Sequence, residues 1–129
     1  MEATALLLTA ALFGGMVLYS AGFAGFLFKV LPPNTAGASL RRAFPVFYLL
    51  VIATSLAAAV MVFSSDLMSA LALAAIAVTT VPTRQLLMPA INDASDAGNK
   101  RRFGILHGVS VLITLAHIAL AGWVLIRFL

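Results

Sequence analysis

Apolar residues fill four long blocks of this sequence, and short polar or proline-containing segments separate the blocks. Each block has about the 20 apolar residues that a helix needs to cross a bilayer. We expect membrane-spanning helices at residues 3–28, 43–63, 67–88 and 103–128. The sequence therefore predicts an all-α polytopic membrane protein, folded as a four-helix antiparallel transmembrane bundle.

Prolines and polar residues predict where these helices end. The pair Pro32-Pro33 supplies no backbone donors and ends the first helix, and the polar segment 89–99 is expected to be a loop. Pro45 is expected in the first turn of the second helix, where a missing N–H costs little. Ser65 or Asp66 is well suited to cap the third helix. Pro82 is expected to kink that helix near its far end.

The composition supports the same class of protein. The chain has 129 residues, of which 63% are hydrophobic and 9% charged, whereas soluble domains carry about 25% charged residues. The length fits one transmembrane domain, residues 1–129. The chain has no cysteine, which excludes disulfides, thiolate nucleophiles, iron–sulfur clusters and cysteine-based zinc sites.

The positive charges lie where predicted helices meet the membrane surface, so they orient the chain rather than bind nucleic acid. Seven of the eight basic residues fall on one side: Lys29, Arg41, Arg42, Arg84, Lys100, Arg101 and Arg102. Only Arg127 falls on the other. The positive-inside rule then makes loops 29–42 and 89–102 cytoplasmic and places both termini outside. The first helix has no positive segment before it and is expected to be retained. We expect an integral protein of a bacterial inner membrane.

Glycines form faces on two of the predicted helices. Gly15 and Gly22 lie on one side of the first helix, and Gly104 and Gly108 form a G-x-x-x-G pair in the fourth. Small residues let neighbouring helices approach closely. The pattern predicts that these glycines lie against other helices.

Five polar residues fall in or beside the cytoplasmic half and are the candidates for ligand binding: Lys29, Tyr48, Arg84, His107 and Ser110. A charge at membrane depth is costly unless it reaches the surface or a partner. Arg84 is therefore expected to reach lipid phosphate, carbonyls freed by the proline kink, or an anionic ligand. We predict that Arg84 and His107 belong to one polar cluster with Tyr48 nearby.

The two histidines share a polar stripe with Ser110 and Thr114, within roughly 80° on the predicted fourth helix. Ten residues separate His107 from His117, or ~15 Å along a helix axis, so they cannot share one metal ion. A haem would need a second axial ligand from methionine or another subunit. Structural hydrogen bonding is the favoured interpretation of both histidines. We predict no metal site and leave cofactors unassigned.

Four blocks carry a resemblance to a known family: 31–37 (Leu-Pro-Pro-Asn-Thr-Ala-Gly), 43–48 (Ala-Phe-Pro-Val-Phe-Tyr), Thr83-Arg84 through Pro89, and 103–110 (Phe-Gly-Ile-Leu-His-Gly-Val-Ser). Their order and spacing over most of the chain are similar to the transmembrane-protein-205-like family, small membrane proteins without a settled biochemical activity. The resemblance implies a four-span membrane protein and adds no mechanism. The family often has asparagine where this chain has Thr114.

Three functions remain open. The preferred one is a small solute-handling, permease-like protein in which Arg84 and His107 meet the cargo. The second is a structural or accessory subunit that docks through glycine faces onto a larger membrane complex, and the third is a redox subunit that binds haem or quinone. The sequence has no nucleotide loop, H-E-x-x-H motif or paired carboxylates, so no enzymatic activity is predicted. The expected partners are the lipid bilayer and either a second copy or a larger complex.

Overall fold

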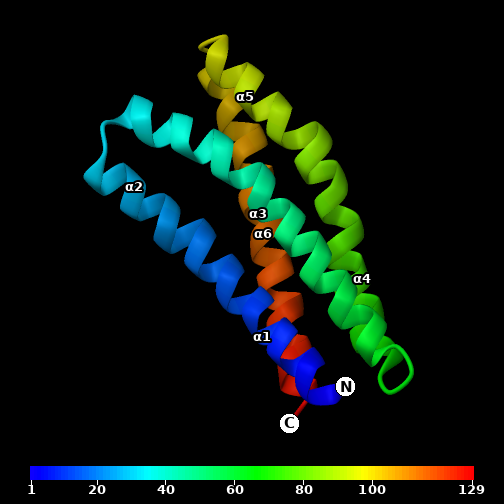
Figure 1. Ribbon diagram of the computed structural model, residues 1–129. Coiled ribbons are helices and arrows are strands. Elements are labelled where there is room, and N and C mark those ends of the chain that lie inside the picture. Colours follow the sequence, from blue (N-terminus) through cyan, green and yellow to red (C-terminus); the bar gives the residue numbers. More distant parts are fainter.

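The computed structural model describes the whole chain, residues 1–129, as helices that join end to end into four rods (Figure 1). The first rod contains α1 (Glu2–Val17), η1 (Leu18–Phe23) and α2 (Ala24–Val30), and the second is α3 (Pro33–Val62). The third rod contains α4 (Leu67–Pro82), η2 (Thr83–Leu87) and α5 (Met88–Asp96), and the fourth is α6 (Lys100–Arg127). By length and composition, each of the 4 rods is able to cross a membrane.

Consecutive rods run antiparallel, which confirms the predicted helical bundle. α1 packs against α3 and α6, and α4 packs against the same two helices, so the four rods form a closed ring at this level. Both termini and the turn at residues 63–66 lie at one end of the bundle, which we call the terminal end (Figure 1). The opposite end carries Lys29, Arg41, Arg42 and residues 100–102, and we call it the basic end.

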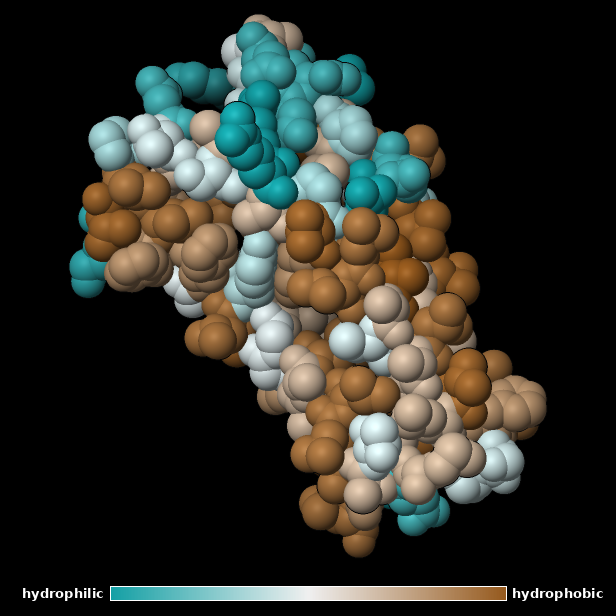
Figure 2. Space-filling view, in the orientation of Figure 1, coloured by the Kyte–Doolittle hydropathy of each residue, from teal (hydrophilic) through white to brown (hydrophobic).

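The two ends differ in how tightly the rods pack. At the basic end α2 packs mainly against α3 and leans away from the other rods (Figure 1). α5 continues the third rod along α6. Figure 2 shows a hydrophilic cap over this end, a broad hydrophobic band around the middle and a small hydrophilic patch at the terminal end. This distribution is what a membrane-spanning bundle presents to lipid and water.

Capping residues account for the turns. Asp66, one of the two caps that the sequence predicted, caps α4 by accepting a hydrogen bond from the Ser69 backbone N–H at 3.2 Å. Asn99 caps α6 in the same way through the Arg102 N–H. Gly98 has a φ of 68°, the left-handed conformation that commonly follows a helix end and favours glycine.

Two helices extend beyond the predicted spans. α3 begins at Pro33, so Pro45 lies inside the helix and not in its first turn. The segment 89–99, expected to be a loop, is helical through Asp96. Neither segment contains a residue that stops a helix in its interior, and α5 buries Ala94 against the bundle. The first rod ends at Val30, before the paired prolines Pro32-Pro33, and the third rod ends at Asp96, before Gly98.

Two widened π-helical turns, η1 and η2, interrupt the first and third rods. Pro82 directly precedes η2; it has no N–H to donate and its ring crowds the preceding turn. In η1 the Ser20 hydroxyl donates to the Met16 carbonyl one turn back, a bond that commonly bends helices. The expected disturbance at Pro82 is therefore present as a π-turn.

The centre of the bundle is filled by small and medium-sized side chains. The largest fully buried side chains are those of Met16, Leu73, Ile76, Val62, Val124, Thr9, Thr80 and Ser55. The hydroxyls of Thr9, Thr80 and Ser55 donate to carbonyls one turn back in their own helices, which satisfies them inside the core. The result is a tightly packed interior between the rods.

Candidate functional site at the basic end

Arg84 connects the third rod to α3. Its Nε donates to the Pro45 carbonyl at 3.0 Å, and its Nη1 donates to Oε1 of Gln85 at 2.7 Å. The residue is half-buried within η2. Arg84 therefore reaches a backbone carbonyl, but this carbonyl belongs to α3 and was not freed by Pro82, so it is none of the three expected partners. A guanidinium has five N–H donors, so three donors remain without a partner.

Tyr48 lies three residues after Pro45 on α3 and belongs to an aromatic cluster. Its ring centroid lies 5.8 Å from that of Phe44 and 5.7 Å from that of Phe47. Tyr19 of η1 stacks on Phe47, with a centroid distance of 4.4 Å and an interplanar angle of 2°. Tyr48 is buried in this cluster and does not face an open site, and the stack of Tyr19 on Phe47 holds the first rod to α3.

His107 lies on the outer face of α6. It is exposed, and its ring stacks on Phe103 with centroids 5.4 Å apart and an interplanar angle of 5°. The ring nitrogens form no hydrogen bond, and no hydrogen bond joins His107 to Arg84. The hydroxyl of buried Ser110 donates to the His107 carbonyl at 2.7 Å. The five candidate residues thus divide among separate helices, with Lys29 exposed near the end of α2.

His117 has a partner that the sequence did not identify. Its Nε2 lies 2.7 Å from the Thr79 hydroxyl oxygen, which joins α4 to α6. Thr79 Oγ1 also lies 2.6 Å from the Ala75 carbonyl, to which it donates its only proton. The oxygen must then accept from the imidazole, which assigns the proton of the neutral ring to Nε2. The expected structural hydrogen bond of His117 is present.

The four glycines predicted to pack against other helices do not do so within this chain. A Cβ at Gly15, Gly104 or Gly108 would meet no atom within 4 Å, and one at Gly22 would meet only Leu18 of its own rod. The prediction of close packing inside the bundle is therefore wrong for these positions. Each lies on the outer surface, because the buried side of its helix carries other residues.

The glycine that does pack closely is Gly122, where a Cβ would lie 3.2 Å from the Phe13 ring. This contact brings α6 against α1 in the terminal half of the bundle. At 100° per residue Gly122 lies near the same line of α6 as Gly104 and Gly108, so periodicity gives no reason to separate it from them. Only the way in which α6 crosses α1 distinguishes Gly122, which is covered, from Gly104 and Gly108, which are open.

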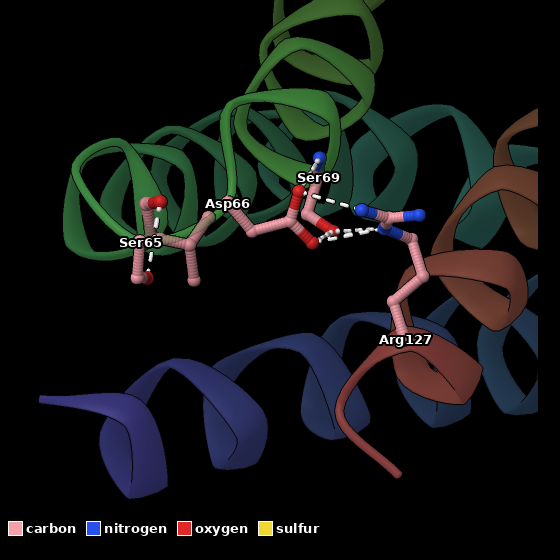
Figure 3. Close-up of polar contacts among 5 residues, drawn as sticks. Ser65, Asp66, Ser69 and Arg127 are labelled. Carbon is pink, nitrogen blue, oxygen red and sulfur yellow. Dashed lines mark hydrogen bonds and ion pairs between the residues drawn. The ribbon is translucent and has the colours of Figure 1, made fainter.

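A polar clamp at the terminal end was also missed (Figure 3). Arg127 binds Asp66 through two hydrogen bonds of 2.8 and 2.9 Å, and its Nε lies 3.1 Å from the Ser69 hydroxyl. Its guanidinium also lies 4.9 Å from the ring centre of Trp123. The hydrogen bonds from Arg127 and Ser69 hold the pKa of the Asp66 carboxyl well below its usual range. The sequence did contain a signal for this pair, because Asp66 and Arg127 both lie at predicted helix ends on the same side of the membrane.

A second ion pair joins helices at the basic end. Arg41 of α3 contacts Asp96 of α5 at 2.7 Å, and the same guanidinium lies 3.4 Å from the Asn92 carbonyl. This pair lies beyond the hydrophobic part of both helices. It joins the basic end of α3 to the last turn of α5.

Comparison with known proteins gives one match. A family described as a domain of unknown function (DUF4149) matches residues 7–100, which include three rods and the turn before α6. Curated proteins and solved structures give no match.

Proposed function

This chain belongs to the DUF4149 family, and we propose that it is an accessory subunit that docks onto another membrane protein through α6. The observation that carries the proposal is the outer face of α6 near the basic end. Gly104, His107, Gly108, Val111 and Leu115 lie on one side of the helix at 100° per residue. We call these five residues the α6 face.

The α6 face is suited to contact another helix. Both glycine positions are open, so a second backbone can approach closely. His107 is the unsatisfied polar group on this face, and it lies about 7 Å along the axis from Arg102 into the apolar part of α6. A polar group without a partner in hydrocarbon is costly. A helix that offers a hydrogen-bond partner to the imidazole removes this cost.

The filled interior also favours docking over passage through the bundle. Met16, Leu73 and Ile76 are among the side chains that occupy the centre. The open glycine positions of α6 and the His107 ring lie on the outer surface of the bundle instead. The proposal assigns no catalytic residue and no metal.

A photo-crosslinking amino acid at Val111 tests the proposal in membranes of the protein's own source. We expect a cross-link to a protein partner of one defined mass, and we expect Gly108→Leu to abolish it. Ala116→Leu, an exposed substitution on another side of α6, is the matched control and leaves the cross-link intact. The same probe at exposed Val78 of α4 gives no such product. Cross-links to lipid alone at Val111 would refute docking, whereas a product of twice the chain mass identifies the partner as a second copy.

Solute handling is the second candidate, and the unpaired donors of Arg84 favour it. Three N–H groups beside the Pro45 carbonyl are able to bind an anionic group. Lys29, Tyr48, His107 and Ser110 belong to this candidate as predicted ligand residues. Uptake of labelled anions into vesicles containing the purified protein, compared with Arg84→Gln, measures it. Equal uptake by the two proteins would remove this candidate.

We further infer that the protein is a transmembrane-protein-205-like member of its family and that it belongs to a bacterial inner membrane. Three of the four sequence blocks behind this assignment lie at or near the basic end, and the fourth opens α6. We place both termini outside and the basic end in the cytoplasm, in accord with the positive-inside rule. This orientation puts the α6 face at the level of the cytoplasmic leaflet.

A further inference from the structure

An apolar groove lies on the outer surface of the first rod, away from the α6 face. It has a volume of about 500 Å³ and is lined by Gly15, Leu18, Tyr19, Gly22, Phe23 and Phe26. Its floor is open where the two glycines have no side chain. We call it the first-rod groove.

The shape of the groove follows from local structure. The π-turn of η1 contains four of its six lining residues, and such turns are frequent at functional sites. One wall is fixed, because the Tyr19 ring stacks on Phe47 and meets the Phe44 ring edge-on at 5.6 Å. The groove is therefore held open by packing between the first rod and α3.

Lys29 continues the same helical stripe toward the membrane surface. Within α2 it lies three residues after Phe26, about 60° around the helix, which keeps it on the side of the helix that carries the end of the groove. It is exposed and forms no ion pair or hydrogen bond within the chain. Fourteen residues separate it from Gly15, or ~21 Å along the helix. Half of a hydrocarbon core is ~15 Å thick. In a tilted rod, the groove therefore extends from near the membrane surface, where Lys29 lies, to the membrane centre.

We propose that the first-rod groove binds an anionic phospholipid, with one acyl chain along the groove and the phosphate at Lys29. The apolar lining suits the acyl chain, and the free ammonium of Lys29 suits the phosphate. Arg41, Arg42 and residues 100–102 add positive charge at the same end of the bundle. Anionic headgroups are attracted to such basic surfaces.

Charge argues against a second copy of the chain in this groove. Two copies related by a two-fold axis along the membrane normal present the same end to the same surface. Their Lys29 side chains would then meet as like charges beside two further sets of arginines. An anionic lipid neutralises this charge instead.

Quenching by brominated lipids tests the proposal on the full chain. A Phe26→Trp reporter in a Trp123→Phe background is placed in phosphatidylcholine vesicles that contain either brominated phosphatidylglycerol or brominated phosphatidylcholine. We expect the anionic lipid to associate about fivefold more strongly at this position. Leu50→Trp, on the exposed face of α3, is the reporter control and shows little preference.

Matched variants assign the lipid to the groove and to Lys29. Lys29→Gln removes the fivefold preference and Lys29→Arg restores it, whereas Gly22→Leu fills the groove and reduces quenching by both lipids. Ala21→Leu, an exposed neighbour outside the groove, leaves quenching unchanged, and circular dichroism confirms that each variant is folded. Equal quenching by the two lipids, or a preference that survives Lys29→Gln, overturns the proposal. A reporter shielded from both lipids also overturns it, because protein then occupies the groove. None of these readings depends on docking through α6.

Discussion

The two ends of this bundle close in different ways. At the terminal end α1, α4 and α6 meet closely, with Gly122 against Phe13 and Arg127 bound to Asp66. At the basic end the first rod leans away from the others, and its main neighbour is α3. One end therefore holds the fold together, and the other leaves helix surfaces free for lipid or protein.

The comparison teaches that polar residues serve different purposes at the two ends. The single basic residue of the terminal end is bound by an acid, a hydroxyl and an aromatic ring. At the basic end Lys29 and His107 have no hydrogen-bond partner in the chain, and Arg84 uses two of its donors. Unused donors at one end are the reason that both proposals fall there.

The largest expected effect is all-or-none and concerns which end faces the cytoplasm. Single cysteines replace Ser65, in the exposed turn of the terminal end, and Ser95, in exposed α5 of the basic end. We expect an impermeant thiol reagent added outside intact cells to label position 65 and spare position 95. Permeabilised cells are the control and label both. The reverse pattern would mean that the orientation is inverted.

The next effect separates closed from open glycines. Gly122→Leu is expected to lower the free energy of unfolding by about 1–3 kcal/mol, because the new side chain must displace the Phe13 ring. Gly104→Leu meets open space and is expected to leave stability equal or higher, since leucine is the better helix former. Unfolding in detergent measures both. A similar loss in the two variants would show that the basic end is as tightly packed as the terminal end.

The smallest effects concern the two ion pairs. Asp66→Asn is expected to lower the melting temperature more than Asp96→Asn. The Asp66 pair has two hydrogen bonds and a side chain that is 27% exposed, compared with 63% for Asp96. Asparagine still caps a helix, so the first variant removes mainly the charge. Equal shifts would mean that the clamp contributes no more than an ordinary surface pair.

The pH dependence of the clamp gives an independent reading of the same comparison. The Asp66 pKa is lower in the folded protein than in the unfolded chain. The clamp therefore stabilises the fold fully above the ordinary aspartate pKa of about 4, and this contribution decreases as the pH falls below it. The difference in melting temperature between the wild type and Asp66→Asn is expected to shrink on acidification. A constant difference would show that Asp66 is not held as an anion by Arg127.

The candidate site was predictable as a set of residues but not as an arrangement. The cost of a charge at membrane depth singled out Arg84, but its partner, the Pro45 carbonyl of α3, is none of the three that the sequence predicted. The hydrogen bond of His117 with Thr79, and the lack of one between His107 and Arg84, depend on how α6 rotates against the third rod. Periodicity fixes which residues share a face of one helix, and it does not fix which neighbour that face meets.

The sequence by itself determined that this chain is an all-α bundle of four membrane-length helices, because hydrophobic length and charge bias are properties of each segment alone. It also narrowed the cap of the third helix to Ser65 or Asp66, because capping depends on residues only a few positions apart. Only the tertiary structure decided where the rods lean apart, which glycines are covered and where the π-turns shift the helical faces. These features depend on side chains from different rods meeting at one place, and no single segment carries that information.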